Sequence, residues 1–408
     1  MKSIFRISIA LLVISYTTYS QWYTQSSGVI NSLKSVYFIN ENTGYVIGEG
    51  LILSTTNAGT NWNNVSLPGR NNDILFVNSN TGFICSDSGR VYKTSNAGLN
   101  WSLVNTGTFN NLMRISFLDE STGLIVGFNR TILKTTNSGV SWGSLITNLD
   151  TLNFFGCKII NENDYIVTGS SSSIYRSTNS GTSWIPATMG VVNPLWVPAF
   201  INDNTGWITG CCGMFIKTTN TGQTWSPEIY LTLGYTLYTM KFINNTTGYV
   251  SGDNGIIFRT TNQGNSWDST ATGTNEILYS MFMVNQNTGW AVGNYGTILK
   301  TTNGGGPGYT IGIQHISNEL PEHFSLSQNY PNPFNPTTRI RFEIPKLSNT
   351  KITVFDILGK EVMTLIDVEI KPGIYEIDFD GISLASGIYY YSLKSGDYFT
   401  TQKMVLVK

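Results

Sequence analysis

Tryptophan returns along this chain at a nearly constant spacing, which strongly limits the folds open to it. Successive members of the series lie 39 to 42 residues apart, and the next interval ends at Gly308. A fixed period of about 40 residues indicates a repeat architecture in which each unit buries its apolar face against the next. The series consists of Trp22, Trp62, Trp101, Trp142, Trp184, Trp225 and Trp267.

A short polar phrase stands before each tryptophan after the first. It places Thr or Ser two residues before an Asn and Gly two residues after it, as in Thr55, Asn57 and Gly59. An Asn side chain can hydrogen-bond the backbone two residues further on, and Gly tolerates positive φ, so the phrase predicts a tight hairpin turn. The Asn positions are Asn57, Asn96, Asn137, Asn179, Asn220 and Asn262. A seventh copy, around Asn303, has no tryptophan after it.

Each unit also contains short β-rich runs separated by turn residues, which predict four antiparallel strands per unit. Seven units predict an all-β fold, a seven-bladed β-propeller over residues 21–310, in which only short sheet edges remain. The seventh unit lacks its tryptophan strand, and Trp22 has no unit before it. We therefore expect the strand at Trp22 to complete the last blade and close the ring. The alternative, an open solenoid, would need capping units, and none is visible.

These repeats resemble a known family. The turn phrase is similar to the Asp-box, or BNR repeat, with Asn in place of the usual Asp. The whole unit resembles the propeller of the photosystem II stability and assembly factor family over roughly residues 22–310. The resemblance implies a propeller whose boxes are structural, and it leaves the function open because one fold hosts many activities.

The composition and the N-terminal sequence indicate which cell compartment and which partners to expect. Charged residues make up 12% of the 408, and the formal net charge is −1, so no basic excess points to nucleic acid. Lys2 and Arg6 precede an apolar run over residues 7–15, and small residues follow before Gln21. This pattern predicts a signal peptide over residues 1–20. No later segment is long enough to predict a membrane span.

The chain has four cysteines, and its predicted export would place them where disulfides can form. They are Cys85, Cys157, Cys211 and Cys212. They fall in three different predicted blades, so most pairs would be too far apart for a disulfide. The adjacent pair could form a strained bridge or bind a soft metal, or all four could be unbridged thiols. No His or further Cys stands at metal-site spacing, so neither a metal nor another cofactor is predicted.

A second module follows a predicted linker over residues 311–323. It covers residues 324–408, and its alternating apolar residues suggest a small Ig-like sandwich. The module closely resembles the type A sorting domain of the type IX secretion system. The residues that carry the resemblance are Pro331, Asn332, Pro333, Gly359, Gly387, Tyr389 and Lys403. It implies interaction with that secretion machinery and passage through the periplasm to the outer surface or medium. The alternative is an ordinary Ig-like adhesion module.

An enzyme has to be considered because Asp-box propellers include glycosidases. Two carboxylates would have to face one sugar bond, and the candidates are Glu49, Asp87 and Asp253. Neither a sialidase-like arginine triad nor its Phe-Arg-Ile-Pro phrase is recognisable, and both histidines, His315 and His323, lie outside the propeller. We therefore predict no catalytic residues, with a surface glycoside hydrolase as the alternative function.

A candidate binding face emerges from the residue that enters the innermost strand of each unit. Four consecutive units place an aromatic residue there, which predicts a crescent around the channel mouth that docks a surface protein or a glycan. Core packing between blades is the competing interpretation. The aligned residues are Lys34, Asn72, Met113, Phe155, Trp196, Tyr238 and Tyr279. Arg130, Asp253 and Tyr295 are expected in loops nearby.

Overall fold

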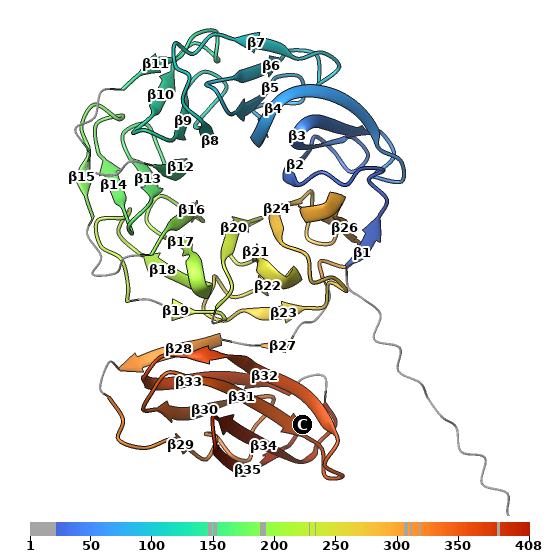
Figure 1. The fold of residues 1–408 in the computed structure, drawn as a ribbon, viewed down its shortest axis with the longest axis vertical. Coiled ribbons are helices and arrows are strands. Elements are labelled where there is room, and N and C mark those ends of the chain that lie inside the picture. Colours follow the sequence, from blue (N-terminus) through green and yellow to red (C-terminus); the bar gives the residue numbers. More distant parts are fainter. Residues whose placement is uncertain are drawn as a thin grey trace, which may run out of the picture.

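A computed structural model describes residues 22–145, 149, 153–187, 193–227, 229–232, 234–305, 309–310, 312–317, 320–381 and 384–408. Within them the fold is all-β, as predicted, and the strands form a ring with a second group of strands beside it (Figure 1). The only helices in these residues are three single 3₁₀ turns, η1 (Cys211–Gly213), η2 (Asp253–Gly255) and η3 (Asn294–Gly296). The predicted signal peptide and Gly308 lie outside the described residues.

The first part of the ring is built from antiparallel sheets that follow chain order. One sheet comprises β2 (Leu33–Phe38), β3 (Gly44–Thr55), β4 (Asn63–Phe76), β5 (Gly82–Ser86), β6 (Val91–Thr94) and β7 (Ser102–Val104). The next comprises β8 (Leu112–Phe117), β9 (Gly123–Gly127), β10 (Ile132–Thr135) and β11 (Gly143–Ser144). It is followed by β12 (Phe154–Ile159), β13 (Tyr165–Gly169), β14 (Ile174–Ser177) and β15 (Ile185–Pro186). β4 is long because residues 63–70 pair with β3 and residues 71–76 pair with β5.

The second part of the ring continues the pattern and includes the N-terminal strand. Its sheets contain β16 (Leu195–Phe200), β17 (Gly206–Gly210), β18 (Met214–Thr218) and β19 (Ile229–Tyr230), then β20 (Leu237–Phe242), β21 (Gly248–Gly252), β22 (Ile257–Thr260) and β23 (Asp268–Thr270). The last sheet contains β24 (Leu278–Met283), β25 (Gly289–Gly293), β26 (Ile298–Thr301) and β1 (Tyr23–Gln25). Thus β1 pairs with β26 although more than 270 residues separate them, with Tyr23 opposite Lys300.

Stacked rings join neighbouring repeats. Phe38 of β2 lies 3.4 Å from Trp290 of β25, measured between ring centroids, so this contact connects the two ends of the ring. Equivalent stacks join Tyr45 to Phe76 at 5.4 Å, Phe83 to Phe117 at 4.8 Å and Trp207 to Phe242 at 4.6 Å. Several periodic tryptophans, including Trp62, Trp101 and Trp142, then pack edge-on against these stacks. The rhythm in the sequence therefore records inter-repeat packing.

The turn phrases hold the outer hairpins. In the first copy the Thr55 hydroxyl donates to Asn57 Oδ1, and it accepts from the Gly59 N–H at 2.9 Å. Asn57 Oδ1 also accepts from the backbone N–H of Asn61, four residues on, where we had expected a bond two residues on. Gly59 has φ of +80°, as predicted. Ala58 before it has φ of +57°, so the turn uses two left-handed residues.

The C-terminal module consists of two sheets around one core. One sheet contains β28 (Gly312–Ser317), β33 (Gly373–Asp380), β30 (Thr337–Ile344) and β29 (Ser325–Leu326). The other contains β32 (Glu361–Ile370), β31 (Ser348–Phe355), β34 (Gly387–Ser395) and β35 (Tyr398–Leu406). The core lies between them, with Phe342, Ile377, Val354 and Leu393 buried.

The stretch expected to be a linker differs from the prediction. β27 (Tyr309–Thr310) pairs with β23, and β28 pairs along β33 and at Tyr230 with β19. The range 311–323 therefore contributes a strand to the C-terminal module, and that module sits beside β19 and β27 in Figure 1. A strand here was hard to predict, since its partner β33 begins about 60 residues later in the sequence.

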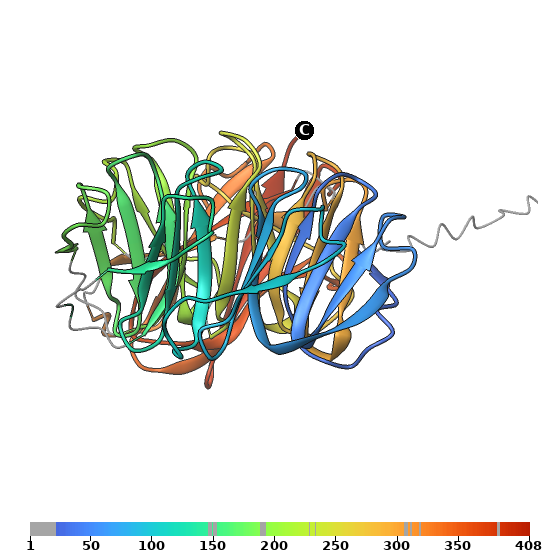
Figure 2. The ribbon, with the colours of Figure 1, turned by 90° about the horizontal axis from the view of Figure 1, so that it is seen from above.

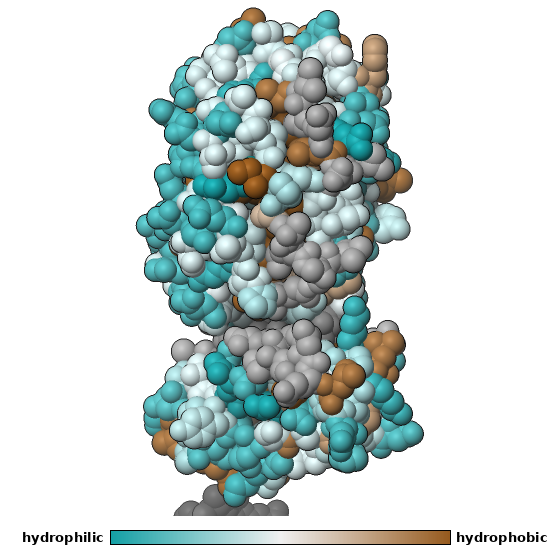
Figure 3. Space-filling view, turned by 90° about the vertical axis from the view of Figure 1, so that its left-hand side faces the viewer, coloured by the Kyte–Doolittle hydropathy of each residue, from teal (hydrophilic) through white to brown (hydrophobic). Residues whose placement is uncertain are grey.

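Figure 2 shows the ring edge-on, with the C-terminal module behind it. The outer surface in Figure 3 is largely hydrophilic or neutral, with hydrophobic residues scattered over both parts. Exposed apolar side chains include Val65, Leu103, Ile185 and Phe399. Isolated apolar residues of this kind are normal on a folded surface and indicate no site.

Loss of the N-terminal strand should destabilise the ring. Trp22 is fully buried, and its indole N–H donates to Thr270 Oγ1 at 3.1 Å. We expect Trp22→Ala to lower the free energy of unfolding by about 3–5 kcal/mol, and deletion of residues 21–27 to lower it further. The measurement is denaturant unfolding of the mature chain.

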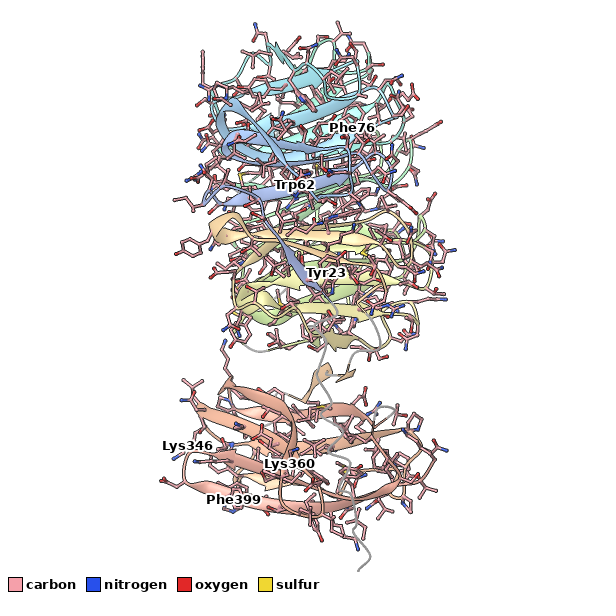
Figure 4. All side chains as sticks on the ribbon, turned by 90° about the vertical axis from the view of Figure 1, so that its right-hand side faces the viewer. Tyr23, Trp62, Phe76, Lys346, Lys360 and Phe399 are labelled. Atoms are coloured by element: carbon pink, nitrogen blue, oxygen red, sulfur yellow. The ribbon has the colours of Figure 1, made fainter. Side chains whose placement is uncertain are left out.

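Tyr23→Ala is the matched control, because Tyr23 follows Trp22 directly as the first residue of β1 and its side chain is partly exposed (Figure 4). It should cost less than about 1 kcal/mol, the span of strand propensities. If deletion of residues 21–27 left the unfolding curve unchanged, β1 would have no role in holding the ring together.

Candidate docking site

The inner strands share an irregularity at their second residue. In β2 the pairing with β3 passes from Leu33 directly to Ser35, which leaves Lys34 out of register. The same shift occurs around Tyr238 in β20 and around Tyr279 in β24. A bulge of this kind leaves one residue unpaired and redirects its side chain. The shift recurs at Asn72, Met113, Phe155 and Trp196.

The aromatic members of this series contact one another in order. Ring centroids are 4.8 Å apart between Phe155 and Trp196, and 5.4 Å apart between Trp196 and Tyr238. Tyr238 and Tyr279 follow at 5.2 Å. These are the distances of favourable ring pairs. The structure therefore brings the four predicted aromatic residues together as one row, which we call the aromatic crescent.

The crescent continues at both ends. Phe128, in the loop after β9, lies edge-on to Phe155 with centroids 6.2 Å apart. At the other end the Lys34 ammonium sits 3.5 Å from the centre of the Tyr279 ring, a cation–π contact. Burial lowers the pKa of Lys34. The row thus runs from a neutral aromatic end to a cationic end.

The four aromatic side chains of the crescent are half-buried. Each therefore packs against its neighbours and also keeps surface in contact with solvent. The indole N–H of Trp196 has no hydrogen-bond partner among the described residues. By contrast, Trp207 and Trp290 are fully buried in the stacks between repeats. The crescent combines the two roles that the sequence left as alternatives, packing and an accessible aromatic surface.

Two further residues lie beside the crescent, Asp253 and Asn294, directly after the last residues of β21 and β25. Asp253 accepts a hydrogen bond from the Thr236 N–H at 2.7 Å. Burial, followed by the charge of Asp253, raises the pKa of Tyr238. Burial also raises the pKa of Tyr279. Both tyrosines therefore stay protonated near neutral pH and present hydroxyl groups at the mouth.

The structure separates the other predicted loop residues from the crescent. Arg130 is exposed with φ of +60°, two residues after Phe128, and no contact joins its side chain to the crescent within the described part of the chain. Tyr295 is 73% exposed in η3 and borders a shallow hollow of about 590 Å³ with Val29 and Ile30. Of the three loop residues, only Asp253 joins the row.

Sequence reasoning missed two contributors. Lys34 stood in the aligned series but was not singled out, because it is not aromatic. Phe128 was missed because the residue at its place varies widely between repeats. That position holds Glu49, Asp87, Phe128, Ser170, Cys211, Asp253 and Asn294. Aligning this second position would have found Phe128.

The candidate carboxylates have separate local partners. Glu49 forms an ion pair with Arg70 at 3.1 Å, and Asp87 pairs with Arg90 at 2.9 Å. Asp253 accepts a hydrogen bond from the Thr236 N–H. No two of these three carboxylates are in contact with each other in the described structure. Each carboxylate thus interacts with a nearby residue and not with another of the candidate carboxylates.

The cysteines fall into two classes. Cys85 and Cys157 are buried thiols, and burial raises the pKa of each. Cys211 and Cys212 are partly exposed in η1, with their sulfur atoms 2.6 Å apart and Cys212 at φ of +62°. Burial, then the neighbouring thiol, raises the pKa of Cys211 to about 12. Among the described residues no group of three His, Cys, Asp or Glu side chains could hold a metal ion.

The opening phrase of the C-terminal module packs against the last strand. Asn332 accepts from the Val405 N–H at 2.9 Å and donates to the Lys403 carbonyl at 3.2 Å. Buried Asn329 donates to Pro331 and Thr338. The peptide bonds before Pro331 and Pro333 are cis. Two other residues of the predicted sorting motif take part in local structure. Gly359 lies in a turn with φ of +76°, and the Tyr389 hydroxyl donates to the Ala385 carbonyl. Lys403 is exposed on β35.

Two family models match the chain, one over the ring and one over the C-terminal module. The family model described as photosynthesis system II assembly factor YCF48 matches residues 21–114, 99–194 and 176–275. The chain belongs to the YCF48 family. The model described as secretion system C-terminal sorting domain matches residues 328–408. The two resemblances inferred from the repeats and from the C-terminal motif are thereby confirmed.

Solved structures share the fold of the ring. YCF48 bound to D1 peptide is 17% identical, with a TM-score of 0.60, and the match covers 73% of this chain and all of that one. YCF48 from Cyanidioschyzon merolae is 16% identical with a TM-score of 0.58, covering 69% and 98%. The WD40 β-propeller domain of Doa1 is 11% identical with a TM-score of 0.57, covering 69% and 97%. At these identities the likeness establishes a propeller-like fold alone.

Two further comparisons are brief. A search of curated proteins found no match. No helix in the described part of the chain is long and apolar enough to cross a membrane.

The dual character of the crescent can be measured. Trp196→Ala removes two ring pairs, each worth about 0.5–1.5 kcal/mol, so we expect a loss of about 1–3 kcal/mol in the free energy of unfolding. Trp207→Ala, the control within the buried stacks, should cost about 3–5 kcal/mol. Denaturant unfolding of both variants provides the comparison. Equal losses would identify Trp196 as an ordinary core residue.

Proposed function

We propose that this protein is an exported docking protein in which a closed seven-bladed propeller presents the aromatic crescent to a surface partner. The partner contributes an extended peptide segment or a glycan. The single observation that supports this function most strongly is the continuous row of half-buried rings at the bulged position of consecutive repeats. Bulges re-aim side chains, and four aligned bulges direct four aromatic side chains to one row.

The chemistry of the crescent favours binding over catalysis. Partly exposed aromatic rings are typical of recognition surfaces. The carboxylates of the loops are engaged by their own arginine or backbone partners, so a pair poised around a sugar bond is missing from the described loops. The relative bound to D1 peptide supports a peptide as the ligand class. The resemblance does not imply a photosynthetic partner, because a sorting module directs this chain to a secretion system.

The proposal treats β1 as the closing strand of the ring. Its support is the pairing of β1 with β26 and the stack of Phe38 on Trp290. We further propose domain bounds of 21–310 for the propeller, with the sorting module, an Ig-like sandwich, starting at β28. That module carries the chain through the periplasm and out of the cell, where the protein is released or held at the outer surface.

Binding can be tested with the mature chain, residues 21–408, on arrays of immobilised peptides and glycans. We expect wild type to bind members of one class and Trp196→Ala to lose about tenfold or more in affinity, as hot-spot residues do. Phe399→Ala is the control, because Phe399 is an aromatic side chain exposed on the C-terminal module (Figure 4). It should bind as wild type does.

Turnover of any glycan on the array by wild type would replace docking with glycoside hydrolysis. Binding that persists in Trp196→Ala, with stability unchanged, would remove the crescent from the recognition surface.

Export can be tested independently in a host that has the secretion system. Deletion of residues 324–408 should trap the protein in the periplasm, as followed by fractionation and immunoblotting. The finer variant Asn332→Ala removes the two hydrogen bonds to the last strand and should slow secretion. Full secretion of the deletion variant would contradict the assignment of the sorting function.

A further inference from the structure

Next to the aromatic crescent the inner strands line an open cavity of about 270 Å³. The cavity is lined by residues that follow the bulge in each inner strand. The fifth residue of such a strand comes three residues after the bulge, which places it roughly 10 Å from the crescent. Water takes up about 30 Å³ per molecule in the liquid, so the cavity has room for several waters or for one small polyatomic ion.

The charged groups that line this cavity are unbalanced. They comprise one carboxylate, Asp73, and three cations, Arg114, Lys158 and Lys241. This excess stands out in a chain whose formal net charge is −1. Two positive charges remain once Asp73 is matched with one cation. Lys158 and Lys241 are half-buried, and a cation that has lost part of its hydration is stabilised by a nearby counter-charge.

Asp73 is already committed to other groups. Its oxygens accept from the Ser35 hydroxyl at 3.0 Å and from the Ile115 N–H at 3.1 Å, and Oδ1 lies 3.4 Å from Arg114 Nη1. The Asp73 carboxylate therefore interacts with Ser35, Ile115 and Arg114. It is not within ion-pair distance of either lysine among the described contacts.

The two lysines occupy the same layer. Each is the fifth residue of its inner strand, Lys158 in β12 and Lys241 in β20, and the small side chain of Ala199 lies in that layer between them. Lys241 rests 4.0 Å from the centre of the Phe282 ring and 5.7 Å from that of Tyr37. Neither ammonium has a hydrogen bond or ion pair with another described residue. Burial lowers the pKa of both, that of Lys241 to about 8.

We infer that the cavity is a binding site for a small oxyanion of the phosphate or sulfate type, held between the ammonium groups of Lys158 and Lys241. Such an ion would supply the missing counter-charge to both lysines at once. The hydroxyl groups of Thr239 and Ser280 also border the cavity and could donate to its oxygens. The site is distinct from the crescent, because it uses different residues at a different depth.

Calorimetric titration of the mature chain with inorganic sulfate, at constant ionic strength set by chloride, tests the inference. We expect one ion per chain with a Kd below about 1 mM. Lys158→Met and Lys241→Met keep the side-chain length and remove the charge, and each should weaken binding by at least about tenfold. Lys93→Met is the control, since Lys93 donates to the Ser138 carbonyl outside the cavity. It should bind sulfate as wild type does.

The pH dependence provides a second readout. Sulfate keeps its charge across the neutral range, so a change in affinity reports the protein. Lys241 must be protonated to bind and its pKa is lowered, so affinity should fall as pH rises through about 8. The other charged groups around it, Asp73, Arg114 and Lys158, are included in that response.

Three results would overturn the inference. Wild type could show no heat and no thermal stabilisation with sulfate or phosphate, which would leave only water in the cavity. Binding could be unchanged in both lysine variants, which would place the ion elsewhere as an adventitious ion only. Should a lysine variant fail to fold, the wild-type titration and its pH profile still decide the matter, because affinity independent of pH would exclude the lysines.

Discussion

The packing of aromatic rings between neighbouring repeats is the interaction on which the rest of the molecule depends. A four-stranded sheet alone cannot bury both faces, so each repeat needs the next. The stacks provide this burial, and the periodic tryptophans pack edge-on against them. Because Phe38 also stacks on Trp290, the same interaction joins the first and last repeats. In the closed ring that we propose, the central cavity and the crescent depend on this contact and on the pairing of β1 with β26.

The bulge near the start of each inner strand redirects one side chain out of the regular alternation of the strand. Without it, the side chain at that position would follow the alternation of the strand. With it, Phe155, Trp196, Tyr238 and Tyr279 meet in one row while the residues on either side keep their register. In the docking role that we propose, packing and recognition use the same side chains. A half-buried ring is already partly ordered, which lowers the entropic cost of binding.

Regular features were predictable from the sequence because they repeat. The turn around Asn57, the all-β class and the role of Trp22 beside the last repeat each follow from a local rule applied several times. Long-range features that interrupt no repeat left no such signal. β28 was taken for a linker because its partner lies far along the chain, and Phe128 was missed because its position varies between repeats. The charge in the cavity was also not predicted, since Asp73, Lys158 and Lys241 lie far apart in sequence and line one cavity only in the folded chain.

The most direct measurement is fluorine NMR of the mature chain labelled with 5-fluorotryptophan, titrated with a peptide or glycan selected on the arrays. The resonance of Trp196, assigned by its absence in a Trp196→Phe variant, should shift or broaden as ligand is added. The resonances of buried Trp207 and Trp290 should stay in place. A ligand that binds without perturbing Trp196, or that perturbs only tryptophans at the outer turns such as Trp62, would contradict a docking site at the aromatic crescent.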